Sequence, residues 1–171
     1  MEVKEIIKSQ YYASLEMLRQ VIKSCPDSLW QNPEYKNQFW QVAYHAIFYT
    51  HFYLHPSEED FIPWDNQKRE YVSFDHSQSA MEDEAPYSKE DILVYHKLCL
   101  ARMEELVDSL DFEAESGFSW LPFNKLELQF YNIRHLQQHT GELSERVGTT
   151  SEVEVKWIGA KPKVEGKATS R

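Results

Sequence analysis

The sequence predicts an all-α protein: a four-helix bundle with a long crossover between helices two and three and a short extended C-terminal tail. Four segments carry apolar residues at helical spacing, and proline or glycine stands at or near their ends. These segments are residues 3–24, 37–54, 89–110 and 122–147. More than thirty residues separate the second segment from the third, which is long for a bundle connection.

The first two helices differ in how much of their surface is apolar. Residues 3–24 have one apolar stripe with Lys and Glu between its members. Residues 37–54 are apolar nearly all round, as in a helix that is packed on several sides. Trp40, Tyr44 and Ile47 lie on one side of this helix, so the crossover, the tail or a second copy of the chain must cover them.

The third and fourth helices have recognisable start and stop residues. Residues 88–91 resemble a capping box at the start of segment 89–110, with Asp in place of the preferred Glu. Pro122 is tolerated in the first turn of segment 122–147, and Gly148 is a natural residue to follow its last turn.

We therefore expect two regions, a bundle at residues 1–148 and an extended, partly disordered tail at residues 149–171. Within the tail, residues 152–158 alternate in polarity like an edge strand. Residues 159–171 have the composition of a disordered segment.

Charge and cysteine content narrow the possible partners and the compartment. The formal net charge is −10, concentrated in residues 56–91, which argues against nucleic acid as a partner. Cys25 and Cys99 form no disulfide framework and suit a reducing compartment. The N-terminus lacks the apolar core of a signal peptide, and no apolar stretch is long enough for a membrane span. We expect a cytoplasmic protein with no membrane partner.

Three histidines predict a metal site. His135 and His139 are four residues apart, so both rings lie on one face of a helix, beside its apolar stripe. His45 lies in the aromatic second helix, and its ring can complete a three-histidine shell that leaves a coordination position open. Gly141 follows in mid-helix, where glycine costs about 1 kcal/mol relative to alanine; close approach of another backbone explains such a residue.

Other sites are less well supported by the pattern. His51 and His55 are also four apart and form the alternative pair, whereas His76 and His96 have the pattern of ordinary polar residues. No histidine has Glu three residues before it, as di-iron bundles require. The segment 135–139 lacks the glutamate that follows the first histidine in zinc metalloproteases.

The order of these features resembles the DinB/YfiT-like superfamily of metal-dependent enzymes. The features are the Pro-Asp-x-x-Trp turn at residues 26–30, His45 in an aromatic helix, the long crossover, and His135-x₃-His139 followed by Gly-Glu-Leu. The resemblance covers residues 3–147 and implies an up-down-down-up bundle, often dimeric. It also implies a divalent ion such as zinc or nickel bound by the three histidines, and activity as a thiol-dependent transferase or a hydrolase.

The resulting functional expectation is an enzyme that acts on a small-molecule substrate, which includes a low-molecular-weight thiol in the transferase version. Its ion activates water for hydrolysis or holds a thiol as thiolate. Glu142 orients a histidine, acts as a base or adds a ligand; alternatively, it only pairs with Arg146. The rival function is a non-catalytic dimeric bundle that binds a ligand or partner and has a vestigial metal site.

Overall fold

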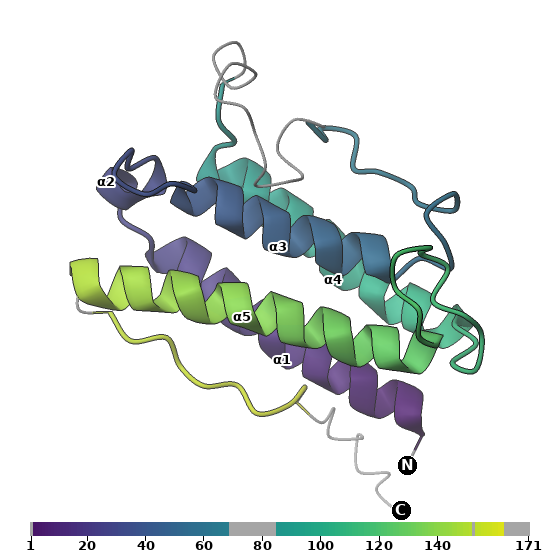
Figure 1. Cartoon of the computed structure of the whole chain (residues 1–171). Coiled ribbons are helices and arrows are strands. Elements are labelled where there is room, and N and C mark those ends of the chain that lie inside the picture. Colours follow the sequence, from purple (N-terminus) through teal and green to yellow (C-terminus); the bar gives the residue numbers. More distant parts are fainter. Residues whose placement is uncertain (1, 69–84, 152, 163–171) are drawn as a thin grey trace, which may run out of the picture.

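A computed structural model describes residues 2–68, 85–151 and 153–162, and this part of the chain is helical (Figure 1). Five helices follow one another: α1 (Val3–Ser24), α2 (Asp27–Trp30), α3 (Phe39–Tyr53), α4 (Lys89–Ser109) and α5 (Lys125–Ser151). Apart from an isolated bridge between Glu115 and Asn124, these described residues form no β-structure. The prediction of an all-α protein is confirmed.

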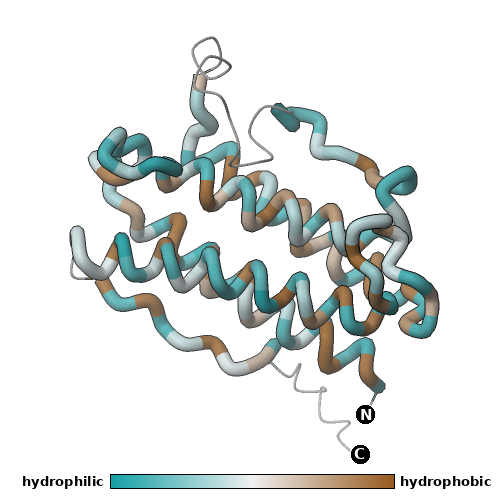
Figure 2. The backbone as a smooth tube through the Cα atoms, in the orientation of Figure 1, coloured by the Kyte–Doolittle hydropathy of each residue, from teal (hydrophilic) through white to brown (hydrophobic). Residues whose placement is uncertain are grey.

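The four long helices pack side by side around one apolar core. α1 packs against α4 and α5, and α3 packs against the same two helices (Figure 1). Hydrophobic positions recur along each long helix, as Figure 2 shows in brown. Because α3 and α5 are neighbours, side chains ninety positions apart in the sequence can meet between them.

The beginning of the chain follows its sequence pattern closely. α1 occupies the predicted residues, and Pro26 stands just after it. The turn expected at residues 26–30 contains a short helix, α2, whose Trp30 is buried. The Trp30 indole donates a hydrogen bond to the Tyr87 carbonyl at 2.9 Å, which ties this turn to the end of the crossover.

The described ends of the crossover cover the apolar side of α3. Tyr87 lies with its ring centroid 4.8 Å from that of Tyr44 and 6.0 Å from that of Trp40. Trp64 stacks on Tyr95 of α4 with centroids 4.6 Å apart. The middle of the acidic crossover, residues 69–84 with His76, lies outside the described residues. The crossover, the tail and a second copy of the chain were the candidates to cover this side of α3. In the structure, the crossover covers Trp40 and Tyr44.

α5 begins at Lys125 and not at Pro122. The Asn124 side chain accepts a hydrogen bond from the Glu127 amide at 2.9 Å, which is the bond of an N-cap, so the helix cannot extend further back. The Lys125 side chain is buried, and its Nζ donates to the carbonyls of His55, Pro56 (2.7 Å) and Ser116. Lys125 thus joins the end of α3 to the start of α5.

The far end of α5 also differs from the prediction. The helix continues through Gly148 to Ser151. The hydroxyls of Thr149 and Ser151 donate back to the carbonyls of Glu145 (2.9 Å) and Val147 (2.8 Å), one turn earlier in the helix, so the helical backbone does not end at Gly148.

Gly141 lies inside α5 with open space around it. An added Cβ at this position meets nothing within 4 Å in the described chain. The expected close approach of another backbone is therefore wrong for this part of the molecule.

The tail runs along α1 as an irregular segment, and the edge-strand prediction for residues 152–158 is wrong for the described residues 153–158. Its backbone bonds to side chains of α1: Gln10 donates to the Gly159 carbonyl (3.3 Å), and the Lys161 amide donates to Ser9 Oγ (3.0 Å). The Lys161 side chain pairs with Glu104 of α4. A helix has few free backbone groups with which a strand could pair. Residues 163–171, part of the segment expected to be disordered, lie outside the described residues.

Two further expectations concern the membrane and the thiols. Among the described helices, none combines the length and the apolar character needed for a membrane span. Cys25 and Cys99 are both free and buried. Burial raises the pKa of the Cys25 thiol to about 12 and raises the pKa of Cys99 as well.

Candidate metal centre

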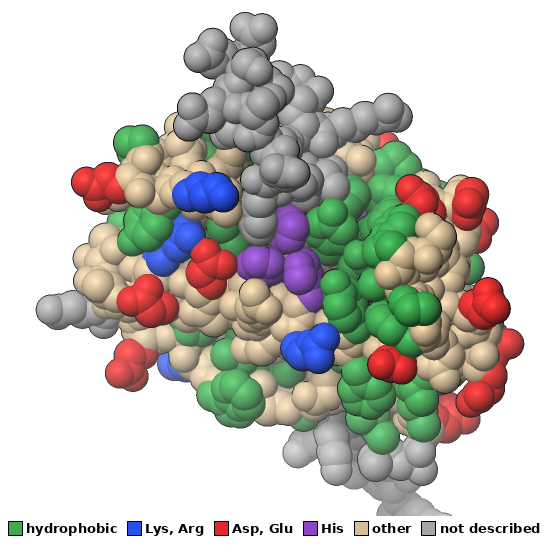
Figure 3. All heavy atoms as spheres, in the orientation of Figure 1, with side chains coloured by type: hydrophobic (Ala, Val, Ile, Leu, Met, Phe, Trp, Pro, Cys, Tyr) green, Lys and Arg blue, Asp and Glu red, His purple; other side chains and the backbone are tan. Residues whose placement is uncertain are grey.

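Three histidine side chains meet between α3 and α5. His45 Nε2 lies 3.2 Å from His135 Nε2, which lies 3.2 Å from His139 Nε2. One nitrogen from each ring falls within 4.8 Å of the other two. Figure 3 shows the histidine side chains in purple, at the surface beside a continuous green hydrophobic patch. No other group of three His, Cys, Asp or Glu side chains converges in this way among the described residues.

Buried polar contacts hold the two helices in the alignment that brings these rings together. The Asn132 amide of α5 donates to the Thr50 carbonyl of α3 at 3.0 Å. Tyr11 of α1 donates its hydroxyl hydrogen to Gln129 of α5 at 2.9 Å. At the start of α3, the Gln38 amide donates to the Gln41 side chain at 2.6 Å. The bonds of Asn132 and Gln129 oppose sliding or rotation of α5, because either motion leaves a buried polar group unpaired, whereas the Gln38–Gln41 bond fixes the start of α3.

The environment of His135 favours a neutral imidazole. Burial, followed by the nearby His139, lowers the pKa of His135 to about 4. Its Nδ1 atom is buried and has no hydrogen-bond partner in the described part of the chain. At neutral pH this ring therefore carries no charge, which is the protonation state that a metal ligand requires.

Glu142 contacts one of the rings from outside the cluster. Its Oε2 lies 3.2 Å from His139 Nδ1, which assigns the ring hydrogen to Nδ1 and leaves the Nε2 lone pair directed at the other histidines. Its other oxygen pairs with Arg146, a buried side chain. A carboxylate that orients a histidine in this way is the usual outer partner of a metal ligand.

Arg146 fixes the position of that carboxylate. It donates to the Asn37 carbonyl at 2.9 Å, and its guanidinium carbon lies 4.3 Å from the centroid of the Tyr35 ring. The segment before α3 therefore fixes the position of Arg146 through these two contacts. Arg146 in turn pairs with Glu142, and Glu142 orients the His139 ring. From the sequence, the pairing of Glu142 with Arg146 was the alternative to a role at the site, and in the structure Glu142 contacts both His139 and Arg146. The contacts of Arg146 with Tyr35 and Asn37 were not predicted.

Two of the three donor separations match those around a tetrahedral ion, and the third, between His45 and His139, lies within 4.8 Å. Zinc–nitrogen bonds of 2.0–2.1 Å at tetrahedral angles separate the nitrogens by about 3.3 Å. The two separations of 3.2 Å are close to this value. Without an ion, only hydrogen bonds can hold three imidazole nitrogens at such distances, and each neutral imidazole has a single ring N–H to donate. The cluster can therefore hold a divalent cation with little movement of its side chains.

The other histidines have separate contacts. His55 Nδ1 lies 2.9 Å from the His51 carbonyl, and His51 Nδ1 lies 3.3 Å from the Tyr95 hydroxyl. His96, expected to be an ordinary polar residue, is buried, and its Nε2 lies 2.8 Å from the Leu15 carbonyl. It thus links α4 to α1. The structure does not bring any of these rings into the three-histidine group.

A comparison with protein families matches residues 10–143 to the model of the DinB superfamily. The chain belongs to the DinB superfamily. The match extends from α1 into α5 and includes the three histidines and Glu142, but it ends before Arg146 and the tail. Comparisons with curated proteins and with solved structures give no match. DinB membership and the histidine cluster together indicate metal binding.

Proposed function

We propose that this DinB protein is a metal-dependent enzyme in which His45, His135 and His139 hold one divalent ion. The observation that carries the proposal is the convergence of three imidazole nitrogens, with two of their separations close to those around a tetrahedral ion. We also infer that the four long helices form the up-down-down-up bundle of the family, and that the bundle ends with α5 at Ser151, three residues beyond the boundary expected from the sequence.

We propose zinc or nickel as the ion, because neutral imidazoles suit both metals. When bound, the ion supplies Lewis acidity that makes a coordinated water or thiol more acidic, which supports hydrolysis or thiol S-transfer. Glu142 keeps the His139 hydrogen on Nδ1, and both of its oxygens are already engaged. This arrangement favours the orienting role for Glu142 over the roles of base or ligand.

The proposed partners follow from the same site. The substrate is a small molecule, and in the transferase version a low-molecular-weight thiol is the second substrate. We propose that neither nucleic acid nor a membrane is a partner. We propose a cytoplasmic homodimer. We propose that its interface includes part of α1 or α3. Of these two helices, α1 exposes Val3 and Ile6, with 47% and 38% of their surface accessible, whereas α3 is covered almost completely.

The first test measures the stabilisation that a metal provides. Chelator-treated protein is melted with and without zinc or nickel at a hundredfold excess over Kd, where binding stabilises the fold by about 2.7 kcal/mol. That free energy corresponds to a rise in Tm of roughly 5–10 °C for a chain of this size. His139→Ala should abolish the rise, and His55→Gln, which changes a histidine outside the cluster, should retain it.

Two results would count against the proposal. A rise retained in His139→Ala places the ion elsewhere, with His51 and His55 as the next candidates. Metal binding without turnover, in a screen of thiol acceptors and esters with the metal-loaded protein, favours the non-catalytic binding protein.

A further inference from the structure

A row of aromatic rings leads away from the three histidines, with members from both α3 and α5. The Tyr49 centroid lies 4.7 Å from that of His45 and 5.6 Å from that of His135. Tyr53 follows at 5.5 Å from Tyr49, and Tyr131 of α5 lies 5.8 Å from Tyr53. Each ring is within the distance at which aromatic groups interact. The row therefore forms one continuous wall from the centre to the start of α5.

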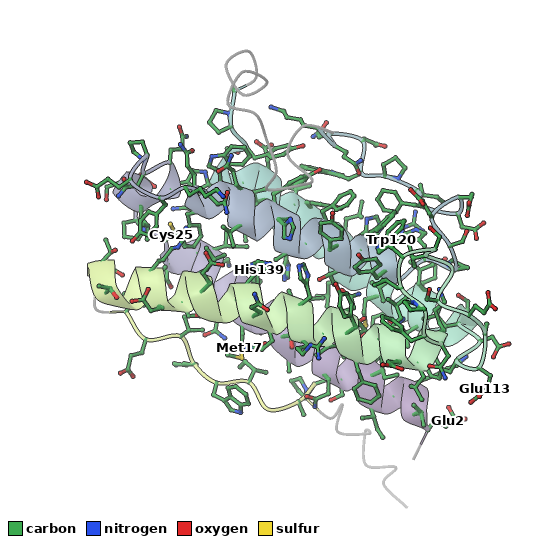
Figure 4. All side chains as sticks on the ribbon, viewed as in Figure 1. Glu2, Met17, Cys25, Glu113, Trp120 and His139 are labelled. Atoms are coloured by element: carbon green, nitrogen blue, oxygen red, sulfur yellow. The ribbon has the colours of Figure 1, made fainter. Side chains whose placement is uncertain are left out.

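The far end of this wall is only partly covered. Trp120 is 49% exposed, and its ring lies nearly parallel to that of Phe52, 6.5 Å away. Figure 4 shows Trp120 near the segment that precedes α5 and His139 near the middle of the helices. In Figure 3 the green patch extends from the purple histidines across this region. An apolar surface that adjoins a polar centre is typical of a ligand site.

One cation stands beside the wall. The Arg134 guanidinium carbon lies 5.6 Å from the centroid of Tyr131. Arg134 is exposed, and within the described residues it has no acidic partner. In contrast, Arg146 on the same helix is buried and paired with Glu142. The guanidinium of Arg134 is therefore available to an anion from solution.

There is room for a small organic molecule at this position. Tyr131, Arg134 and Phe123 contribute to the lining of a surface groove of about 780 Å³ along α5. Ligand sites for small organic compounds usually enclose 300–1,000 Å³. Tyr131 belongs both to this groove and to the aromatic wall, so a molecule in the groove is in contact with the row of rings that reaches the histidines.

We propose that Tyr131 and Arg134, together with the accessible rings of Tyr49 and Trp120, bind the organic part of the substrate, and that this part is an aromatic carboxylate; the buried Tyr53 supports the wall from behind. The ring stacks on the tyrosine wall, and the carboxylate pairs with the Arg134 guanidinium, whose fork of donors matches two carboxylate oxygens. The inference rests on the proposed function, because the wall ends at the proposed metal centre.

The test uses 2-naphthoate and its uncharged analogue 2-naphthamide as probes, titrated into the full chain and followed by ligand-observed NMR. We expect 2-naphthoate to bind roughly tenfold more tightly than the amide, the usual effect of one hydrogen bond to a charged group. Arg134→Gln should remove that preference. Tyr131→Ala should weaken both probes several-fold, and Tyr131→Phe should restore the binding.

Matched controls separate local from general effects. Arg102→Gln removes a similar charge from α4, and Trp157→Ala removes a tail side chain that is 76% exposed; both should bind the probes as the unaltered chain does. The proposal is overturned if the two probes bind equally or if neither binds. It is also overturned if Arg102→Gln has the effect of Arg134→Gln, or if Trp157→Ala has the effect of Tyr131→Ala.

The titrations are run on both chelator-treated and zinc-loaded protein. Binding of 2-naphthoate that requires zinc and is insensitive to Arg134→Gln assigns the carboxylate to the ion and overturns the inference. If zinc fails to stabilise the protein while Arg134→Gln still abolishes the preference, the aromatic carboxylate site stands and the metal proposal fails. The two proposals therefore fail by different measurements.

Discussion

Replacing Gly141 with alanine is expected to stabilise the protein. Gly141 lies in the interior of α5, and a Cβ built there meets nothing within 4 Å in the described chain. The change therefore adds no clash and removes only the conformational freedom that glycine has in the unfolded chain. Host–guest values place this gain at about 0.8–1.0 kcal/mol. For a chain of this length, that gain raises Tm by roughly 2–4 °C.

The assay is urea unfolding followed by circular dichroism, with the slope m compared between variants so that a change in midpoint reports stability alone. Gly117→Ala is a control that should change stability in the opposite direction. Gly117 has φ +80°, and a Cβ there would lie 2.0 Å from the Pro56 carbonyl oxygen. This variant should lose more than about 2 kcal/mol, because both the backbone conformation and the contact are unfavourable.

Metal affinity provides a second readout for Gly141→Ala, because His139 and Glu142 lie on either side of the position. We expect the affinity for zinc to stay unchanged, since the added methyl group points into open space. A variant that is less stable than the unaltered chain, or that binds zinc more weakly, would refute the reasoning. Such a result would place the backbone of a second copy of the chain against this face of α5.

Three further predictions concern the site, acid stability and assembly. Glu142→Gln should weaken zinc binding about 10–100-fold in a competition titration, as loss of an outer partner usually does, whereas the exposed Glu145→Gln should not. Burial lowers the pKa of His51 to about 3, so below pH 6.5 the unfolded chain binds more protons than the folded chain. Metal-free protein should therefore lose roughly 1–2 kcal/mol per pH unit between pH 6.5 and 4 in urea titrations, and an unchanged slope in His51→Phe would assign the loss to other groups. Light scattering at micromolar concentration should give the mass of a dimer, and a monomer mass would exclude the homodimer.

The helices were predictable where local chemistry alone determines their ends. α1 has a clear apolar stripe and a proline just beyond it, and the structure has it at the predicted residues. The capping box of α4 also forms, with the Asp91 amide donating to Ser88 Oγ at 3.1 Å. Apolar periodicity and capping are local properties, so the sequence alone is sufficient to identify them.

The start of α5 was misplaced because the prediction relied on one local signal, the proline at position 122, which is tolerated in a first turn. Asn124 followed by Glu127 is also a start signal, and it is the one that the structure uses. Tertiary contacts decide between such alternatives: the buried Lys125 places its ammonium among three carbonyls from two other segments. Spacing along one helix contains no information about those carbonyls.

The candidate site was partly predictable for the same reason. The spacing of His135 and His139 is a local property, and one apolar helix with His45 was enough to propose the third member. Tyr131 is four residues before His135, so the helical spacing that identified the histidine pair could also have identified this residue. The contacts of Arg146 with Tyr35 and Asn37 depend on how a loop lies over α5, which no periodicity describes.

The buried state of both cysteines determines which sulfur can react at the site. Cys25 and Cys99 are the only thiols in the sequence, and burial raises the pKa of both, so neither provides a thiolate at neutral pH. Any thiol that takes part in catalysis must therefore arrive from solution. The same property makes the native chain a convenient host for a single engineered surface cysteine, since a maleimide dye will report on that residue with little background from the two natural ones.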